Sequence, residues 1–561
     1  MKRAMAIAAA VAAGIGYWAW AQPAPAPLPT IMPAGALLYL EARDFGALAA
    51  DWNGSAEKRT WLASANYQAF SRSSLFLKLG QAQTEFASAA GVPPDYALLG
   101  SVAGGDSALA IYHIGDLEFL YVTRLASARA LNTALWKARG TYQTRAAGGV
   151  TYYLKEDPAS RRSAAFAYAG GMLLLATKGD LVAGALELMA KTARPSIASE
   201  AWFSDAVKAA QPGANQLRMV YNLERLIATP HFRSYWIQRN SPDLREFSSG
   251  VADLEQTRGE FQERRVLLRG AAGAAITDES AAGRALALVP DDAGFYRVWM
   301  KPGAPWAEYS IAEKIFTNTA LAGMVATSAP EVANQADAGS QEDLETRIDE
   351  TPLADNRDAT AFQGLRALLG GVTIEAMLEV SSTRTDAAQV FIGGQTAIAL
   401  LGSSAWDAKA VREGLGSAAA AIWSNPGAGS AWRTGANGME EMEGLGRVAM
   451  AIDGRWLIIG TSPELAAAVF TRRNRAAAEG AVYAAGWRHS RELAGFERMF
   501  RLIDFPQIPA AAGPEQERQP MFFSENVASL GRALGRVQSA SIAVHDAGTM
   551  LRENVVYRIA P

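Results

Sequence analysis

The chain has 561 residues and a formal net charge of −3, with 50% hydrophobic and 19% charged residues. This composition excludes a disordered chain, and the lack of a basic excess argues against a nucleic-acid-binding protein. The absence of cysteine excludes disulfides, thiolate nucleophiles, iron–sulfur clusters, Cys-ligated zinc and a lipidated cysteine after a leader.

The N-terminus has the pattern of an export signal. A basic pair, Lys2-Arg3, precedes an uncharged, mostly apolar run from Ala4 to Ala21, whose last three residues fit a small-x-small cleavage site. A Pro-rich spacer follows, so residues 1–29 are predicted to be a signal peptide or an N-terminal membrane anchor plus spacer. We favour cleavage over a retained anchor, because the run is at the lower limit for spanning a bilayer. Both alternatives place the remaining chain in the periplasm or on the extracytoplasmic face of the inner membrane, and cleavage would release it as a secreted protein.

In the first half of the chain, short apolar runs separated by Gly-containing turns predict strands and hairpins, with helical patterns between them. In chain order we predict a strand at Leu37–Ala42, helices within Phe45–Ala90, a hairpin of Ser107–Tyr112 and Leu117–Arg124, a helix at Ala128–Arg139, a hairpin of Thr141–Ala146 and Val150–Lys155, a hairpin about Gly170-Gly171 followed by a helix, a strand at Gln216–Tyr221, a helix at Pro242–Ser249 and a strand at Phe261–Arg269. Consecutive hairpins form antiparallel sheet and the helices between them cover its faces, so the predicted class is α+β.

The chain also resembles itself. Ala167–Thr177 matches Ala451–Thr461 at an offset of 284, and each segment predicts a strand, a two-residue turn, a strand and then a helix that begins at a Thr-x-x-acid cap, Thr177 or Thr461. Three further matches occur in the same order in both halves: Pro33–Tyr39 with Pro290–Tyr296, Gly104–Ala110 with Gly393–Ala399, and Arg265–Arg269 with Asn554–Arg558. The repetition predicts an internal duplication.

We therefore expect two related α+β domains, residues 30–275 and 285–561, each mainly antiparallel sheet from consecutive hairpins covered by helices. The offset grows from 257 to 289 between the first two of these further matches, which predicts a polar insertion near residues 328–360 in the second copy. That copy should end with a helix at Ser524–Val537 and strands at Ser541–His545 and Asn554–Ile559. The apolar runs MLLLA and WLIIG predict strands buried on both faces, or with one face lining an apolar groove.

The residue patterns assign no catalytic, cofactor-binding or metal-ligating residue, and no cofactor. The four histidines, His113, His231, His489 and His545, lack the spacing of a helical zinc site, so we interpret them as surface or strand-end residues. Ser55-x-x-Lys58 is interpreted as the start of a helix rather than a nucleophile motif. Most of the 14 tryptophans are expected in the core, the alternative being that some line an apolar or carbohydrate-facing groove.

From Pro33 onward, the strand pattern from Pro33 to Tyr39 and the strand–Gly–strand–helix unit resemble a family of bacterial exported, internally duplicated envelope proteins that carry a domain of unknown function. The resemblance implies export and a duplicated α+β fold, and it implies no activity and no site residues.

Two classes of function remain open. We favour a non-catalytic exported cell-envelope protein that binds a protein partner or an apolar ligand, through sheet surfaces or a groove between the halves, with membrane contact through the N-terminal segment if it is uncleaved. The alternative is a periplasmic hydrolase whose site is assembled only in three dimensions. A pocket lined only by apolar side chains would favour binding, and a buried carboxylate pair or a Ser–His contact would favour catalysis.

Overall fold

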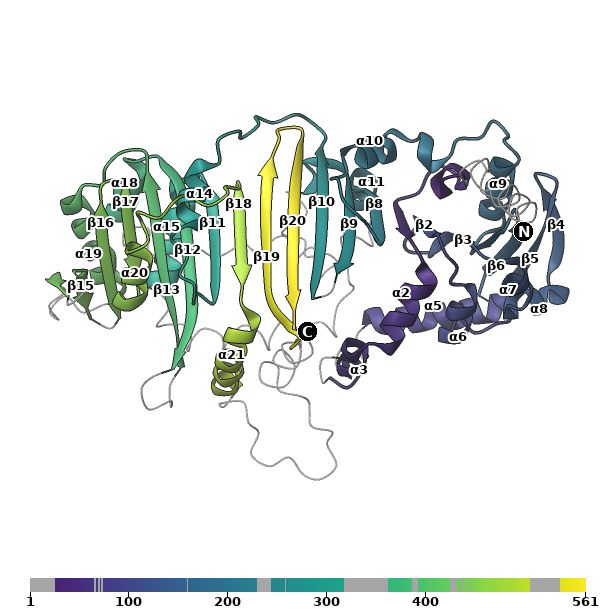
Figure 1. Ribbon diagram of the computed structural model, residues 1–561, viewed down its shortest axis with the longest axis horizontal. Helices are drawn as coiled ribbons and strands as arrows, with labels where there is room; N and C mark the ends of the chain where they lie inside the picture. The colour runs from purple at the N-terminus through teal and green to yellow at the C-terminus, as the bar shows by residue number, and fades with distance from the viewer. Residues whose placement is uncertain are drawn as a thin grey trace, which may run out of the picture. The chain divides into compact units, whose positions relative to one another are not determined.

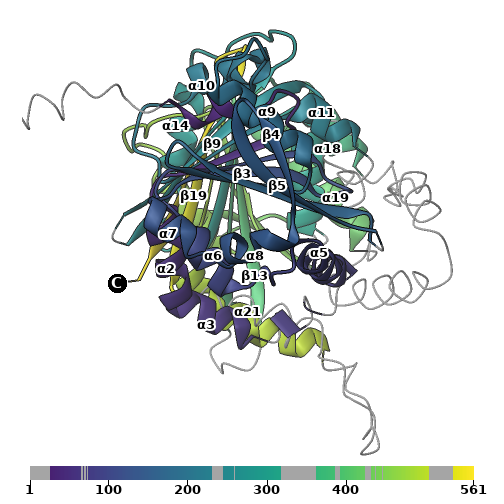
Figure 2. The ribbon, with the colours of Figure 1, turned by 90° about the vertical axis from the view of Figure 1, so that its right-hand side faces the viewer.

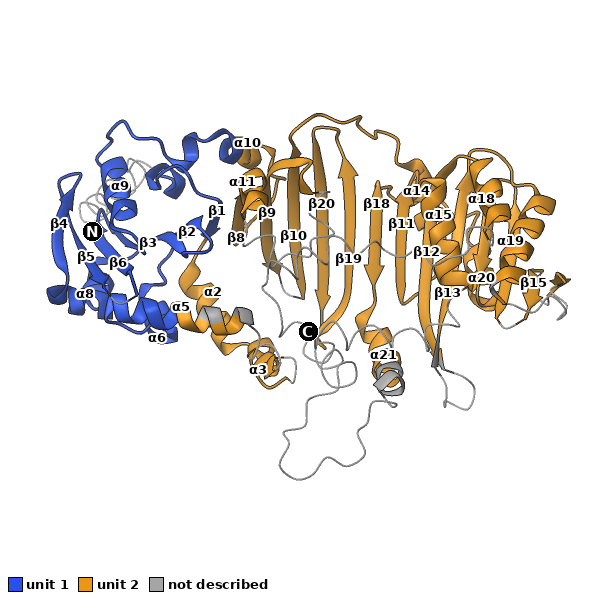
Figure 3. Cartoon of the chain, turned by 180° about the vertical axis from the view of Figure 1, so that it is seen from behind, with its two compact units in different colours: residues 1–41, 83–204 blue, residues 42–82, 205–561 orange. Residues whose placement is uncertain are grey.

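The computed structural model describes residues 26–64, 67–68, 71, 74–158, 160–229, 244–257, 259–316, 362–385, 392–423, 431–435, 438–444, 446–504 and 535–560. The chain forms two compact units: unit 1 contains residues 1–41 and 83–204, and unit 2 contains residues 42–82 and 205–561 (Figure 3). The described helices and strands build an α+β protein with extensive antiparallel sheet, as predicted.

Unit 1 is a layered structure around a sheet. Its elements are η1 (Leu28–Ile31), β1 (Leu38–Ala42), α5 (Ser74–Ala90), α6 (Tyr96–Val102), β2 (Ser107–His113), β3 (Glu118–Arg124), α7 (Ser127–Leu131), α8 (Ala134–Ala138), η2 (Arg139–Thr141), β4 (Gln143–Ala147), β5 (Val150–Asp157), β6 (Arg162–Ala169), β7 (Met172–Ala176), α9 (Gly179–Met189), η3 (Ile197–Ser199) and α10 (Ala201–Ala209). The strands follow the order β1-β2-β3-β7-β6-β5-β4. The neighbouring pairs β2–β3, β3–β7, β7–β6, β6–β5 and β5–β4 are all antiparallel.

Helices cover both faces of the unit 1 sheet, because the central strands are apolar on both sides. All five residues of β7 are buried, as the run MLLLA predicted. On one face α9 packs against β4–β7 through residues such as Val182 and Leu186. On the other face α6, α7 and α8 contribute to a core cluster with Phe166, Leu173 and Leu175. Figure 2 shows these three helices on the side of β3 and β5 away from α9.

Unit 2 contains a longer antiparallel sheet. Its elements are α2 (Phe45–Gly54), α3 (Ala56–Leu62), β8 (Leu217–Asn222), α11 (Leu223–Ala228), β9 (Phe247–Thr257), β10 (Glu260–Arg269), α14 (Ser280–Leu286), β11 (Phe295–Met300), α15 (Ala304–Ile311), η5 (Ala312–Phe316), α18 (Gln363–Gly370), β12 (Ile374–Thr385), β13 (Ile392–Gly402), α19 (Ala408–Ile422), β14 (Arg433–Thr434), β15 (Glu440–Glu443), β16 (Arg447–Asp453), β17 (Trp456–Gly460), α20 (Pro463–Phe470), β18 (Tyr483–Trp487), α21 (His489–Asp504), β19 (Val537–Asp546) and β20 (Met550–Ile559).

The strands of unit 2 follow the order β8-β9-β10-β20-β19-β18-β11-β12-β13-β17-β16-β15-β14, with every neighbouring pair antiparallel (Figure 1). Two core clusters lie on opposite faces of β12, β13, β16 and β17. α15, η5, α18 and α19 cover one face with residues such as Leu365 and Leu415, and α14 and α20 cover the other with Ala282 and Ala466. The run WLIIG forms β17, whose five residues are all buried.

The structure corrects two of the predicted helices, the one at Pro242–Ser249 and the one at Ala128–Arg139. Phe247, Ser248 and Ser249 begin β9 instead of lying in a helix. The segment around Gly250 has weak strand propensity, and its pairing between β8 and β10 overrides that preference. The single helix predicted at residues 128–139 is divided into α7 and α8, because Thr133 leaves the first helix and caps the second by accepting a hydrogen bond from Trp136 N.

The predicted cap at Thr177 is also wrong. α9 starts after Lys178 without a side-chain cap, and α20 is capped by Ser462, the residue after Thr461. The two threonines bind the neighbouring strand instead: Thr177 Oγ1 accepts from Phe119 N on β3 at 3.0 Å, and Thr461 Oγ1 accepts from Thr396 N on β13 at 3.0 Å.

The other predicted strands and hairpins are confirmed where the structure describes them: β1, β2–β3, β4–β5, β6–β7, β8, β10, β19 and β20. Four predictions lie wholly or mostly outside the described residues: the signal or anchor segment, His231, the polar stretch 328–360 and the helix expected to start at Ser524. The structure describes only the end of the spacer, from residue 26, and the last residues of the range predicted for that helix, from residue 535. No helix within the described ranges is long and apolar enough to cross a membrane.

Candidate functional site

A groove of about 450 Å³ opens beside α11 in unit 2, and we call it the α11 groove. Its lining residues come from α11, from the start of β9 and the turn before it, and from the end of β10 and the residue after it: Glu224, Ile227, Arg245, Phe247, Ser248, Arg269 and Gly270. Ile227 and Phe247 are buried and form the apolar floor, whereas Glu224 and Arg245 are exposed at the rim. The groove therefore combines an apolar surface with charges of both signs.

The position of α11 follows from a local cap. The side chain of Asn222, the last residue of β8, accepts a hydrogen bond from Arg225 N at 3.0 Å, so the chain turns directly from the strand into the helix. Leu223 and Ile227, four residues apart on one helix face, pack against Phe247. Tyr221 packs beside them, and its burial raises the pKa of its hydroxyl to about 12.

Arg269 lines the groove and is held by an ion pair. Its guanidinium donates to the two carboxylate oxygens of Asp546 at 2.6 and 2.9 Å and to Gly548 O at 3.1 Å. The guanidinium also lies 5.8 Å from the centroid of the Phe247 ring. The hydrogen bonds with Arg269 lower the pKa of Asp546 and raise that of Arg269, so both stay charged near neutral pH.

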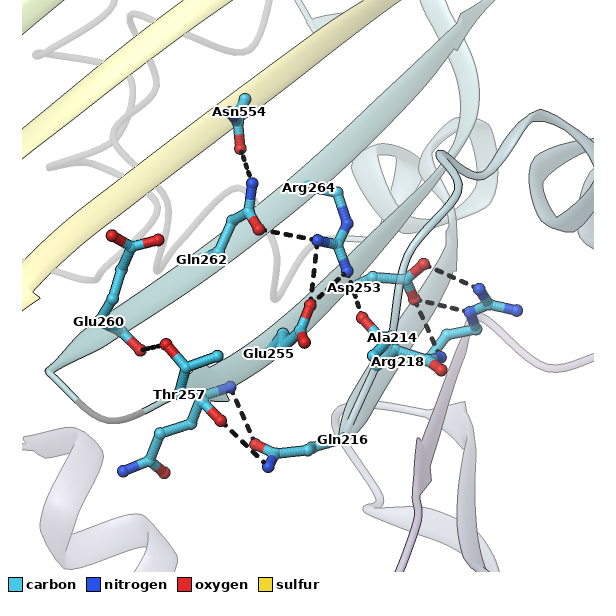
Figure 4. Close-up of polar contacts among 12 residues, drawn as sticks. Ala214, Gln216, Arg218, Asp253, Glu255, Thr257, Glu260, Gln262, Arg264 and Asn554 are labelled. Carbon is cyan, nitrogen blue, oxygen red and sulfur yellow. Dashed lines mark hydrogen bonds and ion pairs between the residues drawn. The ribbon is translucent and has the colours of Figure 1, made fainter.

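A second cluster of charges, which we call the β8–β10 polar network, crosses β8, β9 and β10 (Figure 4). The Asp253 side chain is only 3% exposed and accepts from Arg218 Nε and Nη2 at 2.7 and 2.8 Å and from Asn215 at 3.3 Å. These residues meet because Arg218, Asp253 and Arg264 are directly paired across the three strands. Antiparallel partners lie on the same face of a sheet, so the register alone creates this row of charges.

Arg264 is the buried cation of this network. Its side chain is 8% exposed, and its guanidinium donates to Glu255 at 3.2 Å, to Gln262 at 2.9 Å and to the carbonyl of Ala214. Gly213, with φ of +142°, lies against the guanidinium, where an added Cβ would come within 2.6 Å of Cζ. Each buried ion of the network thus has its own opposite charge, Arg218 for Asp253 and Glu255 for Arg264, which is the arrangement of a structural cluster.

A third buried pair joins β11 to β12. Arg297 donates to both carboxylate oxygens of Glu379 at 3.0 and 2.9 Å, and the Glu379 side chain is 3% exposed. The Arg297 guanidinium lies 4.8 Å from the ring centroid of Trp299, which contacts Trp306 and Tyr483. No sequence motif marks these charges, because their partners come from different strands.

The described histidines lie in three different environments. His113 and His545 are half-exposed at strand ends, as interpreted from the sequence, and their Nδ1 atoms lie 3.2 Å from Asp116 and 2.9 Å from Glu279. His489 lies just after the end of β18, so the strand-end interpretation holds for it, but it is not at the surface: it is only 2% exposed and packs against Trp487 with ring centroids 4.5 Å apart. Its burial results from its place at the junction of β18 and α21.

Other sequence interpretations concern Ser55 and the tryptophans. Ser55 caps α3 by accepting a hydrogen bond from Lys58 N at 3.1 Å, which confirms the helix start. Trp406, Trp423 and Trp456 are buried core residues. Trp52 and Trp306 are instead 49% and 41% exposed.

The α11 groove is neither a purely apolar pocket, which would favour binding, nor a site with a buried carboxylate pair or a Ser–His contact, which would favour catalysis. Its lining includes charged residues as well as Ile227 and Phe247, and its carboxylate at Glu224 lies at the exposed rim. Among the residues that the structure describes, no three His, Asp or Glu side chains lie together in a way that could hold a metal ion. The sequence did not indicate this groove, because Arg245, Phe247 and Arg269 carry no motif.

No family model and no curated protein matches the chain. Among solved structures, crystal form I of TP0453 aligns with a TM-score of 0.27 and 12% identity over 45% of this chain and 82% of that chain. Crystal form IV of TP0453 aligns with a TM-score of 0.24 and 11% identity over 44% of this chain and 81% of that chain. Structural similarity at these TM-scores supports no conclusion about the fold or the function of this chain.

Proposed function

We propose that this chain is a non-catalytic, exported cell-envelope protein that binds a protein partner through the α11 groove. The observation that carries the proposal is the lining of the groove, with Ile227 and Phe247 on the floor and Glu224 and Arg245 at the rim. A volume of about 450 Å³ suits a short polypeptide segment or a small ligand. Charges of both signs at the rim favour a polypeptide over a purely apolar ligand, because its own charges can pair with them.

The expected location rests on the N-terminal sequence. Deleting residues 2–21 removes both the basic pair and the apolar run, so the variant should accumulate in the cytoplasm while the full chain is exported. Cell fractionation followed by immunoblotting measures this. A variant in which Lys409, exposed on α19, is replaced by Ala serves as the matched control and should be exported normally. Export of the deletion variant at the level of the full chain would contradict the location.

The binding prediction is tested by photo-crosslinking in cells. A photoreactive amino acid at Glu224 should give a discrete adduct with a partner, and one at Lys409 should not. Adding the charge reversal Arg245→Glu to the Glu224 probe should lower the adduct yield severalfold, because rim charges govern encounter with a charged partner.

The reversal Lys409→Glu, added to the same probe, is the control and should leave the adduct yield unchanged. Equal adducts from the probes at Glu224 and Lys409, or no adduct from either, would contradict the proposed groove.

We further propose that the two sheets arose by duplication. In support, β1-β2-β3-β7-β6-β5-β4 and β11-β12-β13-β17-β16-β15-β14 have the same order of connections. The hairpins β6–β7 and β16–β17 pair at the offset of 284, with Ala169 opposite Met172 and Asp453 opposite Trp456. In this arrangement β13 corresponds to β3, as the bonds of Thr177 and Thr461 also indicate. The match of Gly393–Ala399 with Gly104–Ala110 on β2 is then inconsistent with the strand order.

A further inference from the structure

Four aromatic side chains of unit 2 form a continuous set of ring contacts where α15 meets the sheet. Trp299 on β11 contacts Trp306 on α15 and Tyr483 on β18, with ring centroids 5.8 and 5.9 Å apart. Tyr309 stacks on Trp306, with centroids 5.4 Å apart and an angle of 16° between the ring planes. We call Trp299, Trp306, Tyr309 and Tyr483 the aromatic patch.

The part of the aromatic patch that lies on α15 is open to solvent. Trp306 and Tyr309 are 41% and 40% exposed, and residues three apart on a helix share one face. The buried residues of the same helix are Ala307, Ser310 and Ile311. The core of unit 2 therefore forms without burying the two exposed rings.

Arg297 gives the aromatic patch a hydrogen-bonding edge. Its guanidinium lies 4.8 Å from the centroid of the Trp299 ring, and both of its hydrogen bonds to Glu379 come from Nη2. Nε is buried, whereas Nη1 is not buried and has no acceptor among the residues that the structure describes. The Arg297 side chain is 28% exposed, so Nη1 is a donor that a ligand can reach.

Tyr483 adds a hydroxyl beside this ion pair. Burial raises the pKa of the hydroxyl, which is close enough to Arg297 and Glu379 for their charges to act on it. The hydroxyl therefore stays protonated near neutral pH, so it can donate a hydrogen bond as well as accept one. Within the described ranges no residue is its hydrogen-bond partner.

The charges that flank the aromatic patch are already neutralised, which indicates the charge of its ligand. Arg297 is paired with Glu379, and Glu308 on α15 accepts from Arg366 Nε and Nη2 at 2.9 and 2.7 Å. A charged ligand would lose hydration here without gaining an opposite charge that lacks a partner. A neutral ligand with hydroxyl or amide oxygens, in contrast, can still accept a hydrogen bond from Arg297 Nη1.

We propose that the aromatic patch binds a neutral oligosaccharide whose ring substituents are equatorial. Such a sugar has apolar C–H faces that stack on exposed tryptophan and tyrosine rings, and polar groups at its edge that bond to Arg297 Nη1 and to the Tyr483 hydroxyl. A lipid chain would cover these donors without supplying an acceptor. The patch shares no residue with the α11 groove, so sugar binding and partner binding can be tested separately.

The direct test is isothermal titration calorimetry of the full-length protein with two neutral tetrasaccharides, cellotetraose and chitotetraose. Both have equatorial substituents that leave the ring faces apolar, and we expect saturable binding of at least one of them. The tetramer of cellouronate has the linkage of cellotetraose and a carboxylate on each ring. It should bind severalfold more weakly than cellotetraose, because the paired arginines beside the patch offer its charges no compensation.

Variants locate the bound sugar on the protein. Trp306→Ser should weaken the affinity about tenfold, equivalent to ~1.4 kcal/mol. Trp52→Ser, at a tryptophan that is 49% exposed on α2, is the matched control and should bind like the wild type. The double variant Arg297→Met/Glu379→Leu removes the hydrogen-bonding edge without leaving an unpaired charge, and should weaken the affinity severalfold. Far-UV circular dichroism checks that the variants remain folded.

The outcomes separate a neutral sugar from other ligands. Failure of both neutral tetrasaccharides to bind overturns the proposal, as does binding that Trp306→Ser and Trp52→Ser weaken equally. Unchanged affinity of the Arg297→Met/Glu379→Leu variant, or equal binding of the cellouronate tetramer and cellotetraose, also overturns it. If an Ala-Pro repeat peptide binds more tightly than either tetrasaccharide and Trp306→Ser abolishes that binding, the patch is a polypeptide site and the proposal is wrong.

Discussion

Replacing Glu379 by Ala is expected to cost about 3 kcal/mol of the free energy of unfolding of unit 2. The substitution removes the carboxylate whose two oxygens accept hydrogen bonds from Arg297 Nη2 on β11 at 3.0 and 2.9 Å. Breaking a buried pair on one side typically costs about 3–5 kcal/mol, because a charge remains uncompensated. The Arg297 side chain is 28% exposed, so water reaches the guanidinium and the lower end of that range applies.

The measurement is native-state hydrogen exchange of the paired amides of β11 and β12, which reports the free energy of opening of this part of the sheet. The double variant Arg297→Met/Glu379→Leu removes both charges and should return to within about 1 kcal/mol of the wild type. Lys409→Ala, which breaks an exposed pair with Glu413, should change stability by less than about 0.5 kcal/mol. A double variant as unstable as Glu379→Ala would show that packing, and not an uncompensated charge, causes the loss.

Replacing Phe166 by Ala is expected to lower the stability of unit 1 by about 3–5 kcal/mol. Phe166 is 0% exposed on β6, and its ring centroid lies 5.1 Å from those of Tyr142 and Tyr153, edge-on to the first and stacked on the second. The substitution removes these contacts and leaves a cavity at the centre of the cluster that α6, α7 and α8 cover.

Hydrogen exchange should detect this loss in the amides of β5, β6 and β7 and leave those of β16 and β17 in unit 2 unchanged, because the cluster belongs to unit 1. Tyr96→Ala, at a tyrosine that is 59% exposed, is the matched control and should cost less than about 0.5 kcal/mol. An equal loss of protection in β16 and β17 would contradict the independence of the two cores.

Much of the strand pattern could be predicted because it is local. The hairpins β4–β5 and β6–β7 turn at Gly148-Gly149 and Gly170-Gly171, where all four glycines have φ between +56° and +76°, which favours glycine over other residues. The fully buried strands β7 and β17 could likewise be predicted, because a run of apolar residues between turns needs cover on both faces.

β9 could not be predicted, because its stability comes from its neighbours. Gly250 lies directly opposite Tyr221, and a Cβ added there would come within 2.7 Å of the tyrosine ring, so the glycine that weakens strand propensity is what lets the aromatic side chain pack. Asp253, also a poor strand former, is held by Arg218 from the adjacent strand.

The sequence by itself determined the class of the fold, the hairpins and the cap at Ser55, because periodicity, turn chemistry and capping act over a few residues. Only the tertiary structure decided that Thr177 and Thr461 bind neighbouring strands, that Arg297 meets Glu379, and that the α11 groove forms where β9, β10 and α11 meet. Each of these depends on strand register between segments far apart in the chain. A shift of register by one residue turns every side chain to the opposite face, so no local pattern can specify which charges meet.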